Sequence, residues 1–496
     1  MNLHSAFLDQ ARRRPDSPAV FFGADTFSYD HFAAGSAVVG GGLRSRFGIQ
    51  PGDRVGLWLH NCPEFITALF GILRAGAVAV PVNNFLKPEE VAYILRDAGC
   101  SMLITDDTLK AAMDTFLIDE AGLPTLTVGE FSALPVPGKD FADAASGAEE
   151  LAVLIYTSGT TGHPKGAMLS HANLLHNVAS CQEALDILAE DRIAVLLPMF
   201  HSFMMTVGIL LPLLTGASQV LVKSLNPPKN AVGELIHHQA TILPAIPQFF
   251  RALAAAPVPP GLALRLCVSD AAPLSVDTLS NFNARYPVPL IEGYGLSEAS
   301  PVVSLNPLHG TKKPGSVGLP IPNVELTIRS EAGEALPQGE TGELCVRGGN
   351  VMSGYWRMPD ATAETIRDGW LYTGDMGHQD ADGYTFRPDR KKDMLLVNGI
   401  NVYPREIEEL LHRYQGIREA AVIGRPDARR GEQPVAYLAL VDGEGLDREA
   451  LRHYLREHLA DYKVPRRYHI LPALPRNATG KILKTTLRKM PEPATA

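Results

Sequence analysis

The chain has 496 residues, more than one hydrophobic core usually supports, so we expect at least two domains. Hydrophobic residues make up 46% of the chain and charged residues 20%, which is typical of a soluble globular protein. The formal net charge is −9, without a long basic run. This composition argues against nucleic acid as a partner, because such binding depends on neutralising phosphates.

The cysteines are scattered and form neither a CxxC pair nor a zinc-binding spacing. They are Cys62, Cys100, Cys181, Cys267 and Cys345. An odd, scattered set favours buried free thiols in a reducing compartment, so we expect a cytoplasmic protein. Residues 1–20 have no apolar core before their arginines, and they predict an amphipathic helix rather than a signal peptide.

Strand and helix patterns alternate early in the chain. Residues 53–60, 77–83 and 101–107 are short, largely apolar runs that predict strands. Residues 63–76 and 87–100, which lie between them, have the periodicity of helices. This alternation predicts a parallel sheet with helices layered against it, the α/β fold class.

Residues 203–222 carry no formal charge and are long enough to cross a bilayer. Pro212 and Gly216, together with neighbouring polar residues, interrupt this apolar run. We therefore predict a buried helix, a turn and a buried strand, and no transmembrane segment.

The pattern changes after residue 310. Short alternating strands separated by Gly and Pro turns predict a small antiparallel or barrel-like unit. A charged turn at 389–392 is then followed by a strand, a turn and a predicted helix at 405–414. The clearest amphipathic helix of the remaining chain is predicted at 448–463.

The stretch IYTSGTTGHPKGAMLSH, residues 155–171, places a loop rich in glycine and hydroxyl groups between two apolar runs. Glycines let the backbone approach an anion, hydroxyls donate hydrogen bonds, and Lys165 adds a positive charge. These residues together indicate a phosphate cradle. It is not a Walker A loop, because Pro164 replaces the required glycine and Gly166 replaces the required Ser or Thr.

This stretch resembles the signature of the adenylate-forming (AMP-binding) superfamily, which includes acyl-CoA synthetases, adenylation domains and luciferases. The family's other motifs follow in its usual order: LPMFHS (197–202), SDAAPL (269–274), EGYGLSE (292–298), DGWLYTGD (368–375), DRKKDMLLVNGINVYPREIE (389–408) and RNATGKILK (476–484). The resemblance implies a large N-terminal domain of several subdomains, with α/β layers and a small β-barrel-like unit. A smaller, mobile α+β C-terminal domain follows. We place the domains at 1–388 and 389–496, with a hinge near Lys392.

The resemblance also implies the reaction. Members of the family use ATP to convert a carboxylic acid to acyl-AMP and pyrophosphate, and a thiol, usually that of CoA, then displaces AMP. ATP, Mg²⁺ and CoA are therefore the expected cofactors and cosubstrates. Catalysis is expected to rest on positioning and on charge stabilisation.

The family's site residues can be carried over position by position. The phosphate loop comprises Thr157, Ser158, Gly159, Thr160, Thr161, Gly162 and Lys165, and the metal ligands are Thr161 and Glu298. The remaining nucleotide contacts are Ala271, Ala272, Glu292, Gly293, Tyr294, Gly295, Ser297, Asp375 and Arg390. Tyr294 resembles the aromatic residue stacked on adenine, and Asp375 the residue that holds the ribose.

Three further roles follow from the resemblance. Lys481 resembles the lysine that stabilises charge during adenylation, and it is expected to act with Thr161, Glu298 and His201. His201 resembles an aromatic gate at the acyl pocket, which Asp270 and Gly295 are expected to border. Gly399, in the VNGIN turn, is expected to line the tunnel for the pantetheine arm of CoA.

Two positions depart from the family pattern. Asp270 replaces the first glycine of the usual SGAAPL, and a buried carboxylate is costly unless it is paired. We therefore expect Asp270 to influence which acid is accepted, the alternative being that it faces solvent without effect. VNGIN replaces the more common SGGEN, with Asn398 and Ile400 at the altered positions.

The apolar motifs most resemble those of medium- and long-chain fatty-acyl-CoA synthetases. No aspartate follows PMFHSF, which argues against amino-acid substrates, although Asp270 leaves this class open. A second hypothesis is transfer of the acyl group to the phosphopantetheine of a separate acyl carrier protein. A third is an inactive binding protein with the same fold, although the presence of Lys165, Glu298, Asp375 and Lys481 weighs against it. The sequence leaves open whether the protein is a monomer or a homodimer.

Overall fold

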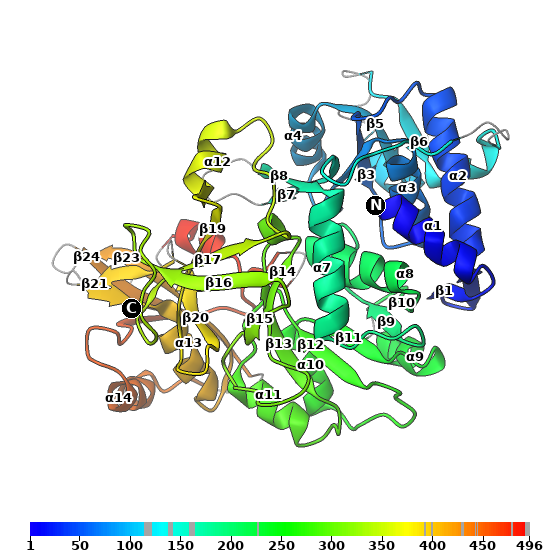
Figure 1. The fold of residues 1–496 in the computed structure, drawn as a ribbon. Coiled ribbons are helices and arrows are strands. Elements are labelled where there is room, and N and C mark those ends of the chain that lie inside the picture. The colour runs from blue at the N-terminus through cyan, green and yellow to red at the C-terminus, as the bar shows by residue number, and fades with distance from the viewer. Residues whose placement is uncertain are drawn as a thin grey trace.

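The computed structural model describes residues 1–491 except for short gaps, and those gaps contain several predicted site residues. The gaps are 114–121, 137–141, 158–163, 226–227, 391–392, 398–399, 428–430, 442, 444 and 478–479. Within the described ranges, the strands form four sheets (Figure 1).

The largest sheet has a parallel centre and antiparallel edges. Its strands, in spatial order, are β15 (Leu319–Pro320), β14 (Val302–Leu305), β13 (Leu290–Gly295), β12 (Leu266–Ser269), β11 (Ile242–Ala245), β9 (Arg192–Val195), β10 (Ser218–Leu221), β1 (Pro18–Phe22) and β2 (Asp25–Ser28). The pairs from β13 to β1 are parallel, whereas β14, β15 and β2 join antiparallel.

A second sheet is also mainly parallel. Its order is β6 (Thr125–Thr127), β5 (Cys100–Thr105), β3 (Arg54–Trp58), β4 (Val78–Pro81), β7 (Leu151–Thr157) and β8 (Lys165–Ser170). Only β8 joins antiparallel among the described pairs of this sheet. The predicted strands at 53–60, 77–83 and 101–107 are confirmed as β3, β4 and β5.

The third sheet is the small antiparallel unit expected after residue 310. It contains β16 (Val324–Arg329), β17 (Gly342–Gly348), β19 (Trp370–Gln379), β18 (Ile366–Arg367) and β20 (Thr385–Arg390). The fourth sheet contains β22 (Ile400–Val402), β21 (Leu395–Val397), β24 (Gly431–Leu440), β23 (Ile417–Asp427) and β25 (Arg467–Ile470). The chain leaves the third sheet at Arg390 and enters the fourth at Leu395, while the hinge at Lys392 lies outside the described residues and stays a prediction.

Helices pack against these sheets. They are α1 (Leu3–Arg13), α2 (Tyr29–Ser45), α3 (Pro63–Arg74), α4 (Pro88–Ala98), α5 (Asp107–Met113), α7 (His171–Ala184), α8 (Leu211–Thr215), α9 (Pro228–His237), α10 (Pro247–Ala255), α11 (Val276–Asn283), α12 (Pro359–Thr365), α13 (Pro404–Arg413), α14 (Arg448–His458) and α15 (Lys484–Lys489). Their starts follow local chemistry. Ser170, for example, caps α7 by accepting a hydrogen bond from the Asn173 amide at 3.1 Å.

Helix α7 joins the two parallel sheets into one body. It contacts β7 and β8 of the second sheet and β14 of the largest sheet, and Figure 1 shows it crossing the middle of the molecule. One continuous apolar core extends through both sheets, from Leu3 in α1 to Leu371 in β19. The C-terminal sheet has a separate core, which includes Ile407 of α13 and Leu455 of α14.

The uncharged segment 203–222 folds as predicted into a buried helix, a turn and a buried strand. Its first part is a π-helix, Met204–Leu210, which continues into α8 and then, after a turn, β10. π-helical turns are uncommon and often occur at functional sites. Across the described ranges, no helix has both the length and the apolar character needed to cross a membrane.

The helix predicted at 448–463 is too long. Helix α14 ends at His458, because Leu459 adopts an extended conformation (φ −130°, ψ 148°). The chain then forms a turn in which the Lys463 amide donates to the Ala460 carbonyl at 2.9 Å. Val464 and Pro465 follow this turn, and the residue before a proline disfavours helix.

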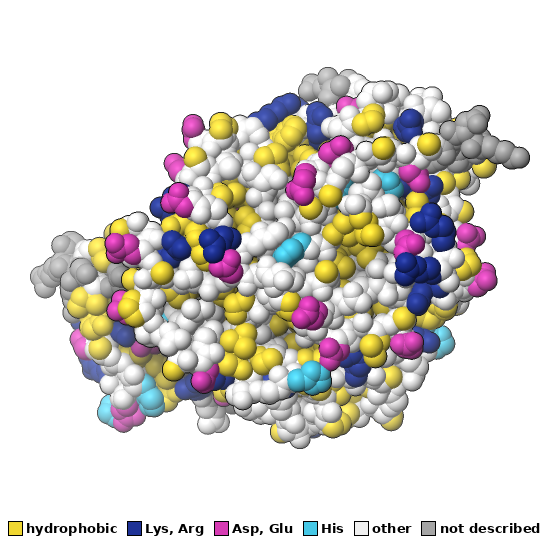
Figure 2. All heavy atoms as spheres, in the orientation of Figure 1, with side chains coloured by type: hydrophobic (Ala, Val, Ile, Leu, Met, Phe, Trp, Pro, Cys, Tyr) yellow, Lys and Arg dark blue, Asp and Glu magenta, His cyan; other side chains and the backbone are white. Residues whose placement is uncertain are grey.

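The distribution of charged side chains and the burial of the cysteines were both expected from composition. Figure 2 shows acidic and basic side chains interspersed over one face of the molecule. All five cysteines are free, but only three are buried, and Cys62 and Cys100 are half-buried. The prediction that all five thiols are buried is therefore wrong for these two.

Candidate active site

A cavity of about 820 Å³ lies where the largest sheet, the second sheet and the antiparallel sheet meet the C-terminal segment around Lys481. The ends of β7 and β13, and Asp270 just after β12, contribute to its wall, which is where ligands bind in open parallel sheets. The predicted site residues among its lining are Thr157, Lys165, His201, Asp270, Ala271, Ala272, Glu292, Gly293, Tyr294, Gly295, Ser297, Glu298, Asp375 and Lys481. Residues from across the chain are thus brought into one place, although the roles given to them stay predictions.

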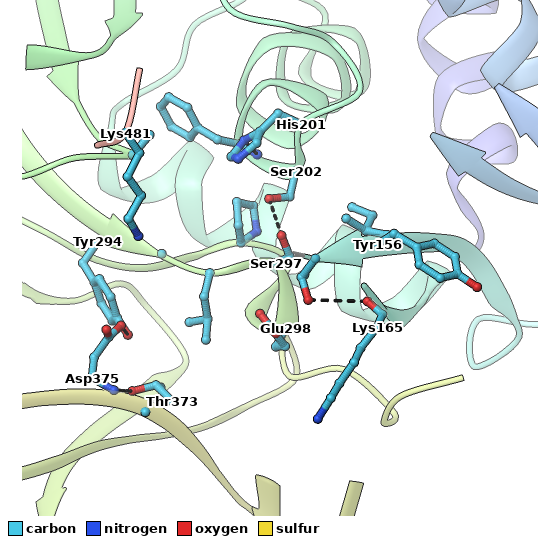
Figure 3. Close-up of a pocket in the computed structure, with 18 of the residues that line it drawn as sticks. Tyr156, Lys165, His201, Ser202, Tyr294, Ser297, Glu298, Thr373, Asp375 and Lys481 are labelled. Carbon is cyan, nitrogen blue, oxygen red and sulfur yellow. Dashed lines mark hydrogen bonds between the residues drawn. The ribbon is translucent and has the colours of Figure 1, made fainter. Parts of the chain in front are cut away.

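The two ends of the predicted phosphate loop are held together. Thr157 ends β7 and Lys165 begins β8, and these residues pair across the two strands. The Thr157 hydroxyl also donates to the Lys165 carbonyl at 3.4 Å, as the dashed line in Figure 3 shows. Ser158, Gly159, Thr160, Thr161 and Gly162 lie outside the described residues, so their arrangement stays a prediction.

Glu298 and Lys165 share a neighbour that the sequence did not indicate. The Tyr355 hydroxyl donates to Glu298 Oε1 at 2.9 Å, and the Tyr355 ring centroid lies 5.1 Å from Lys165 Nζ. Burial, and then the Glu298 charge, raise the pKa of Tyr355, so the phenol stays a donor. Tyr355 is 57 residues from Glu298, and no motif used above contains it.

The described residues contain no group of three or more His, Cys, Asp or Glu side chains arranged to hold a metal ion. A site with one protein carboxylate, Glu298, agrees with the way Mg²⁺ binds nucleotides, since phosphates and water supply most of its ligands. The other predicted ligand, Thr161, lies outside the described residues.

Asp375 and Tyr294 meet on the opposite side of the cavity. The Tyr294 hydroxyl donates to Asp375 Oδ2 at 2.7 Å, and the two residues are only 4% and 5% exposed. The Asp375 amide donates to Thr373 Oγ1 at 3.1 Å, which fixes the backbone of β19 at this point. The structure describes the strand pairing of Arg390 with Asp375 but not the Arg390 side chain.

Asp270 lines the cavity and is 9% exposed, so it does not face solvent. Its Oδ1 accepts a hydrogen bond from the Ala271 amide at 2.6 Å. Ala271 has a φ of +66°, a conformation uncommon for a residue with a Cβ. Glu292 accepts a hydrogen bond from the Leu274 amide at 3.0 Å and thereby ties the SDAAPL segment to β13.

His201 also lines the cavity. Burial, and then the positive charge of Lys481, lower the pKa of His201 to about 4. The imidazole is therefore neutral at physiological pH, and its Nδ1 accepts from the Phe203 amide at 3.3 Å. Beside it, the hydroxyls of Ser202 and Ser297 are 2.9 Å apart, which joins the start of the 203–222 helix to the EGYGLSE motif.

Lys481 comes from the C-terminal part of the chain and reaches into the same cavity. Figure 3 shows its side chain directed between His201 and Tyr294. The C-terminal segment that carries Lys481 therefore lies against the cavity.

Gly295 has a structural explanation in addition to its predicted place at the acyl pocket. A Cβ at this position would lie 2.4 Å from the Pro301 carbonyl oxygen, a contact that real side chains do not make. The close approach of β13 to the following segment therefore requires glycine. Gly399, the predicted tunnel residue, lies outside the described residues.

A second cavity, of about 840 Å³, lies between helices α10 and α11 on one side and α13 on the other. It shares Ala272, Asn477 and Lys481 with the first cavity. The site can therefore be approached from two directions.

The arrangement suits chemistry on a polyphosphate. Lys165 of β8 and Lys481 of the C-terminal segment both bring positive charge to the cavity, and Glu298 can hold a divalent cation. Buried Asp375 offers a charged acceptor for vicinal hydroxyls, because hydrogen bonds to ionised groups are the stronger ones. His201 and Asp270 also line this cavity.

Comparison with known proteins agrees with this geometry. The family model described as AMP-binding enzyme matches residues 7–356, and the model of the AMP-binding enzyme C-terminal domain matches residues 406–481. A long-chain-fatty-acid–CoA ligase of Bacillus subtilis is 35% identical, covering 98% of this chain and 94% of its own. A feruloyl-CoA synthase of an Amycolatopsis species is 36% identical, covering 97% of both chains. The crystal structure of ATP-bound MatB from Rhodopseudomonas palustris superposes with a TM-score of 0.91, at 31% identity over 99% of both chains.

The fold is thus that of the adenylate-forming superfamily. Within it, the chain belongs to the AMP-binding enzyme family, as one of the AMP-forming acid–CoA ligases. It is an acyl-CoA ligase, and its relatives are named for acids as different as long-chain fatty acids and ferulate.

Proposed function

We propose that the chain activates a medium- or long-chain fatty acid with ATP and transfers the acyl group to CoA. In the first step, a carboxylate oxygen attacks the α-phosphorus, the bond to pyrophosphate breaks, and acyl-AMP forms. In the second step, the thiol sulfur attacks the acyl carbon and AMP leaves. The observation that carries the proposal is the convergence of Lys165, Glu298, Asp375 and Lys481 on one cavity.

Each of these residues has a task that its chemistry fits. Lys165 holds the outer phosphates and Asp375 orients the ribose. Lys481 stabilises the charge that develops as pyrophosphate departs. Glu298, together with phosphate oxygens, would hold Mg²⁺, which neutralises phosphate charge when it is bound.

The acyl group would lie between His201 and Asp270. A neutral imidazole can border an alkyl chain at little cost, whereas protonated His201 could not. In this proposal the thiol belongs to CoA, and the phosphopantetheine of a carrier protein is the alternative acceptor.

A specific observation favours a second candidate substrate. Asp270 places a buried carboxylate in the cavity wall, where an acid with a hydroxyl group could donate to it. The feruloyl-CoA synthase relative, named for a hydroxylated aromatic acid, is as similar to this chain as the fatty-acid ligase. A hydroxylated aromatic acid is therefore the alternative substrate class.

The test measures AMP and pyrophosphate release from ATP with a panel of acids: short-, medium- and long-chain fatty acids, hydroxylated fatty acids, benzoate and ferulate. Each acid is assayed with and without CoA. The proposal expects CoA-dependent AMP release that is greatest with a medium- or long-chain fatty acid. A maximum with ferulate would select the second candidate, and pyrophosphate release that CoA does not accelerate would indicate a carrier-protein acceptor. No release with any acid would contradict the proposal.

A further inference from the structure

Glu419 joins the segment that carries Lys481 to a helix of the largest sheet's layer. It lies in β23, and its side chain is 13% exposed. Glu419 Oε1 is 3.1 Å from Arg476 Nη2 and 3.5 Å from Arg251 Nη2 of α10. One carboxylate oxygen therefore bridges two guanidinium groups, one from each side of the interface.

Arg476 contacts both Glu419 and the turn that precedes Lys481. Its Nη1 donates to the Gly480 carbonyl, which also accepts from Gln248 Nε2 at 3.4 Å. The Lys481 amide donates to Asn477 Oδ1 at 2.8 Å, and the Lys481 carbonyl accepts from the Asn477 amide at 2.9 Å. The backbone on both sides of Lys481 is thus hydrogen-bonded.

The turn also rests directly against the neighbouring layer. Gly480 has a φ of +77°, and a Cβ there would lie 2.7 Å from Ile246 Cδ1, just before α10. Arg251 makes a second contact across the interface, because its Nη1 donates to the Arg418 carbonyl at 2.9 Å. A small displacement of β23 would therefore move the turn and, with it, the ammonium group of Lys481.

The charges at this junction are complementary. Burial disfavours a charged Glu419, but the charges of Arg476 and Arg251 outweigh it and hold the pKa of that carboxyl below its ordinary value. Removing the carboxylate would take away the acceptor that the two guanidinium groups share, which is unfavourable in a partly buried site.

We propose that Glu419 is a positioning residue for the first half-reaction: through Arg476 and Arg251 it holds the Lys481 turn in place over the cavity. This inference rests on the proposed function for its kinetic consequence, but its structural consequence is independent of the substrate. Formation of acyl-AMP needs Lys481 in place, whereas transfer of an acyl group that is already activated does not. The two half-reactions should therefore respond differently to loss of Glu419.

The chain offers a matched control in the same C-terminal region. Glu406 of α13 pairs with Lys463 Nζ at 2.9 and 2.7 Å, and neither residue lines the cavity around Lys481. Glu406→Gln makes the same chemical change as Glu419→Gln but leaves the turn untouched. Arg251→Gln removes the guanidinium group that pairs with Glu419 from the side of α10. It replaces Glu419→Gln as the test variant if Glu419→Gln does not fold.

The experiment compares native protein, Glu419→Gln, Arg251→Gln, Glu406→Gln, Lys481→Ala and the double variant Glu419→Gln/Lys481→Ala. The first kinetic readout is single-turnover acyl-AMP formation from ATP with the best fatty acid of the panel. The second is acyl transfer to CoA from the corresponding synthetic acyl-AMP. The third readout, which needs no substrate, is hydrogen–deuterium exchange of the peptide containing residues 480–483.

Glu419→Gln should slow acyl-AMP formation roughly tenfold, the effect of losing about 1.4 kcal/mol of transition-state stabilisation. Acyl transfer should change less than about twofold, and Glu406→Gln should match native protein in both steps. The double variant should be no slower than Lys481→Ala alone, because residues that act as a unit are not additive. Exchange at 480–483 should quicken in Glu419→Gln and Arg251→Gln but not in Glu406→Gln.

Equal slowing of both half-reactions, additive effects with Lys481→Ala, or unchanged exchange at 480–483 would each overturn the inference. If native protein forms no acyl-AMP with any acid, the proposed function fails instead. The exchange measurement then decides the role of Glu419 by itself.

Discussion

Replacing Asp375 by Asn should weaken ATP binding by removing one negative charge while keeping the size of the side chain. Asp375 is 5% exposed and accepts a 2.7 Å hydrogen bond from the Tyr294 hydroxyl, so the carboxylate is held in one orientation. If it also accepts from the ribose hydroxyls, the substitution exchanges charge-assisted hydrogen bonds for neutral ones. A hydrogen bond to a charged group contributes about 1.5–3 kcal/mol, against about 1 kcal/mol for a neutral one.

The free-energy loss for two ribose hydroxyls is then about 1–4 kcal/mol, which corresponds to roughly 5- to 800-fold weaker ATP binding. Isothermal titration calorimetry of ATP and of 2′-deoxy-ATP on both proteins measures this directly. Native protein should discriminate strongly between the two nucleotides, and Asp375→Asn should lose most of that discrimination. Tyr294→Phe is the control, because it removes the donor to Asp375 but keeps both the carboxylate and the aromatic ring.

An ATP affinity of Asp375→Asn within about threefold of native protein would refute this reasoning, as would undiminished discrimination against 2′-deoxy-ATP. Thermal unfolding of the variant should be recorded alongside. A large fall in the melting temperature would mean that Asp375 stabilises the fold and that the binding loss is indirect.

Three other predictions concern the rest of the cavity. Tyr355→Phe removes the hydroxyl that donates to Glu298 but keeps the ring beside Lys165. The Mg²⁺ concentration for half-maximal activity should therefore rise roughly tenfold. Calorimetry should show unchanged binding of ATP in the absence of metal. Because burial and Lys481 lower the pKa of His201 from 6.5 to about 4, the stabilisation by neutral His201 should be fully present above pH 6.5 and fall as pH drops towards 4. Denaturant unfolding of native protein and His201→Phe should therefore diverge only in that acidic range, and a constant difference from pH 4 to 8 would contradict the assigned pKa. Asp270→Gly should increase the ratio of kcat/KM for long-chain over hydroxylated acids, and an unchanged ratio would show that Asp270 has no part in selection.

Local sequence patterns were sufficient for the elements between residues 53 and 107 and for the layer arrangement. Apolar runs that alternate with helical periodicity identified β3, α3, β4, α4 and β5 and implied their parallel pairing. The uncharged segment 203–222 was resolved correctly because Pro212 and Gly216 interrupt it. The end of α14 was missed, because the pattern beyond His458 stays amphipathic while a turn at Ala460 ends the helix.

The contacts within the candidate site could not be predicted from local sequence patterns. The resemblance to a known family selected Tyr294 and Asp375, which are 81 residues apart in the sequence, but their hydrogen bond depends on how two sheets pack. Tyr355 was missed, because neither its distance from Glu298 in the sequence nor the residues next to it indicate a contact with Glu298. The bridge between Arg251 and Glu419 spans 168 residues and is equally invisible in a local window.

The central claim is that the chain forms an acyl-adenylate and passes its acyl group to CoA. Mass spectrometry of the products formed from ATP, CoA and the best acid of the panel tests this claim most directly. Acyl-CoA, AMP and pyrophosphate should form in equal amounts, and acyl-AMP should form when CoA is left out. Formation of ADP and phosphate, or of acyl-CoA without AMP, would contradict it.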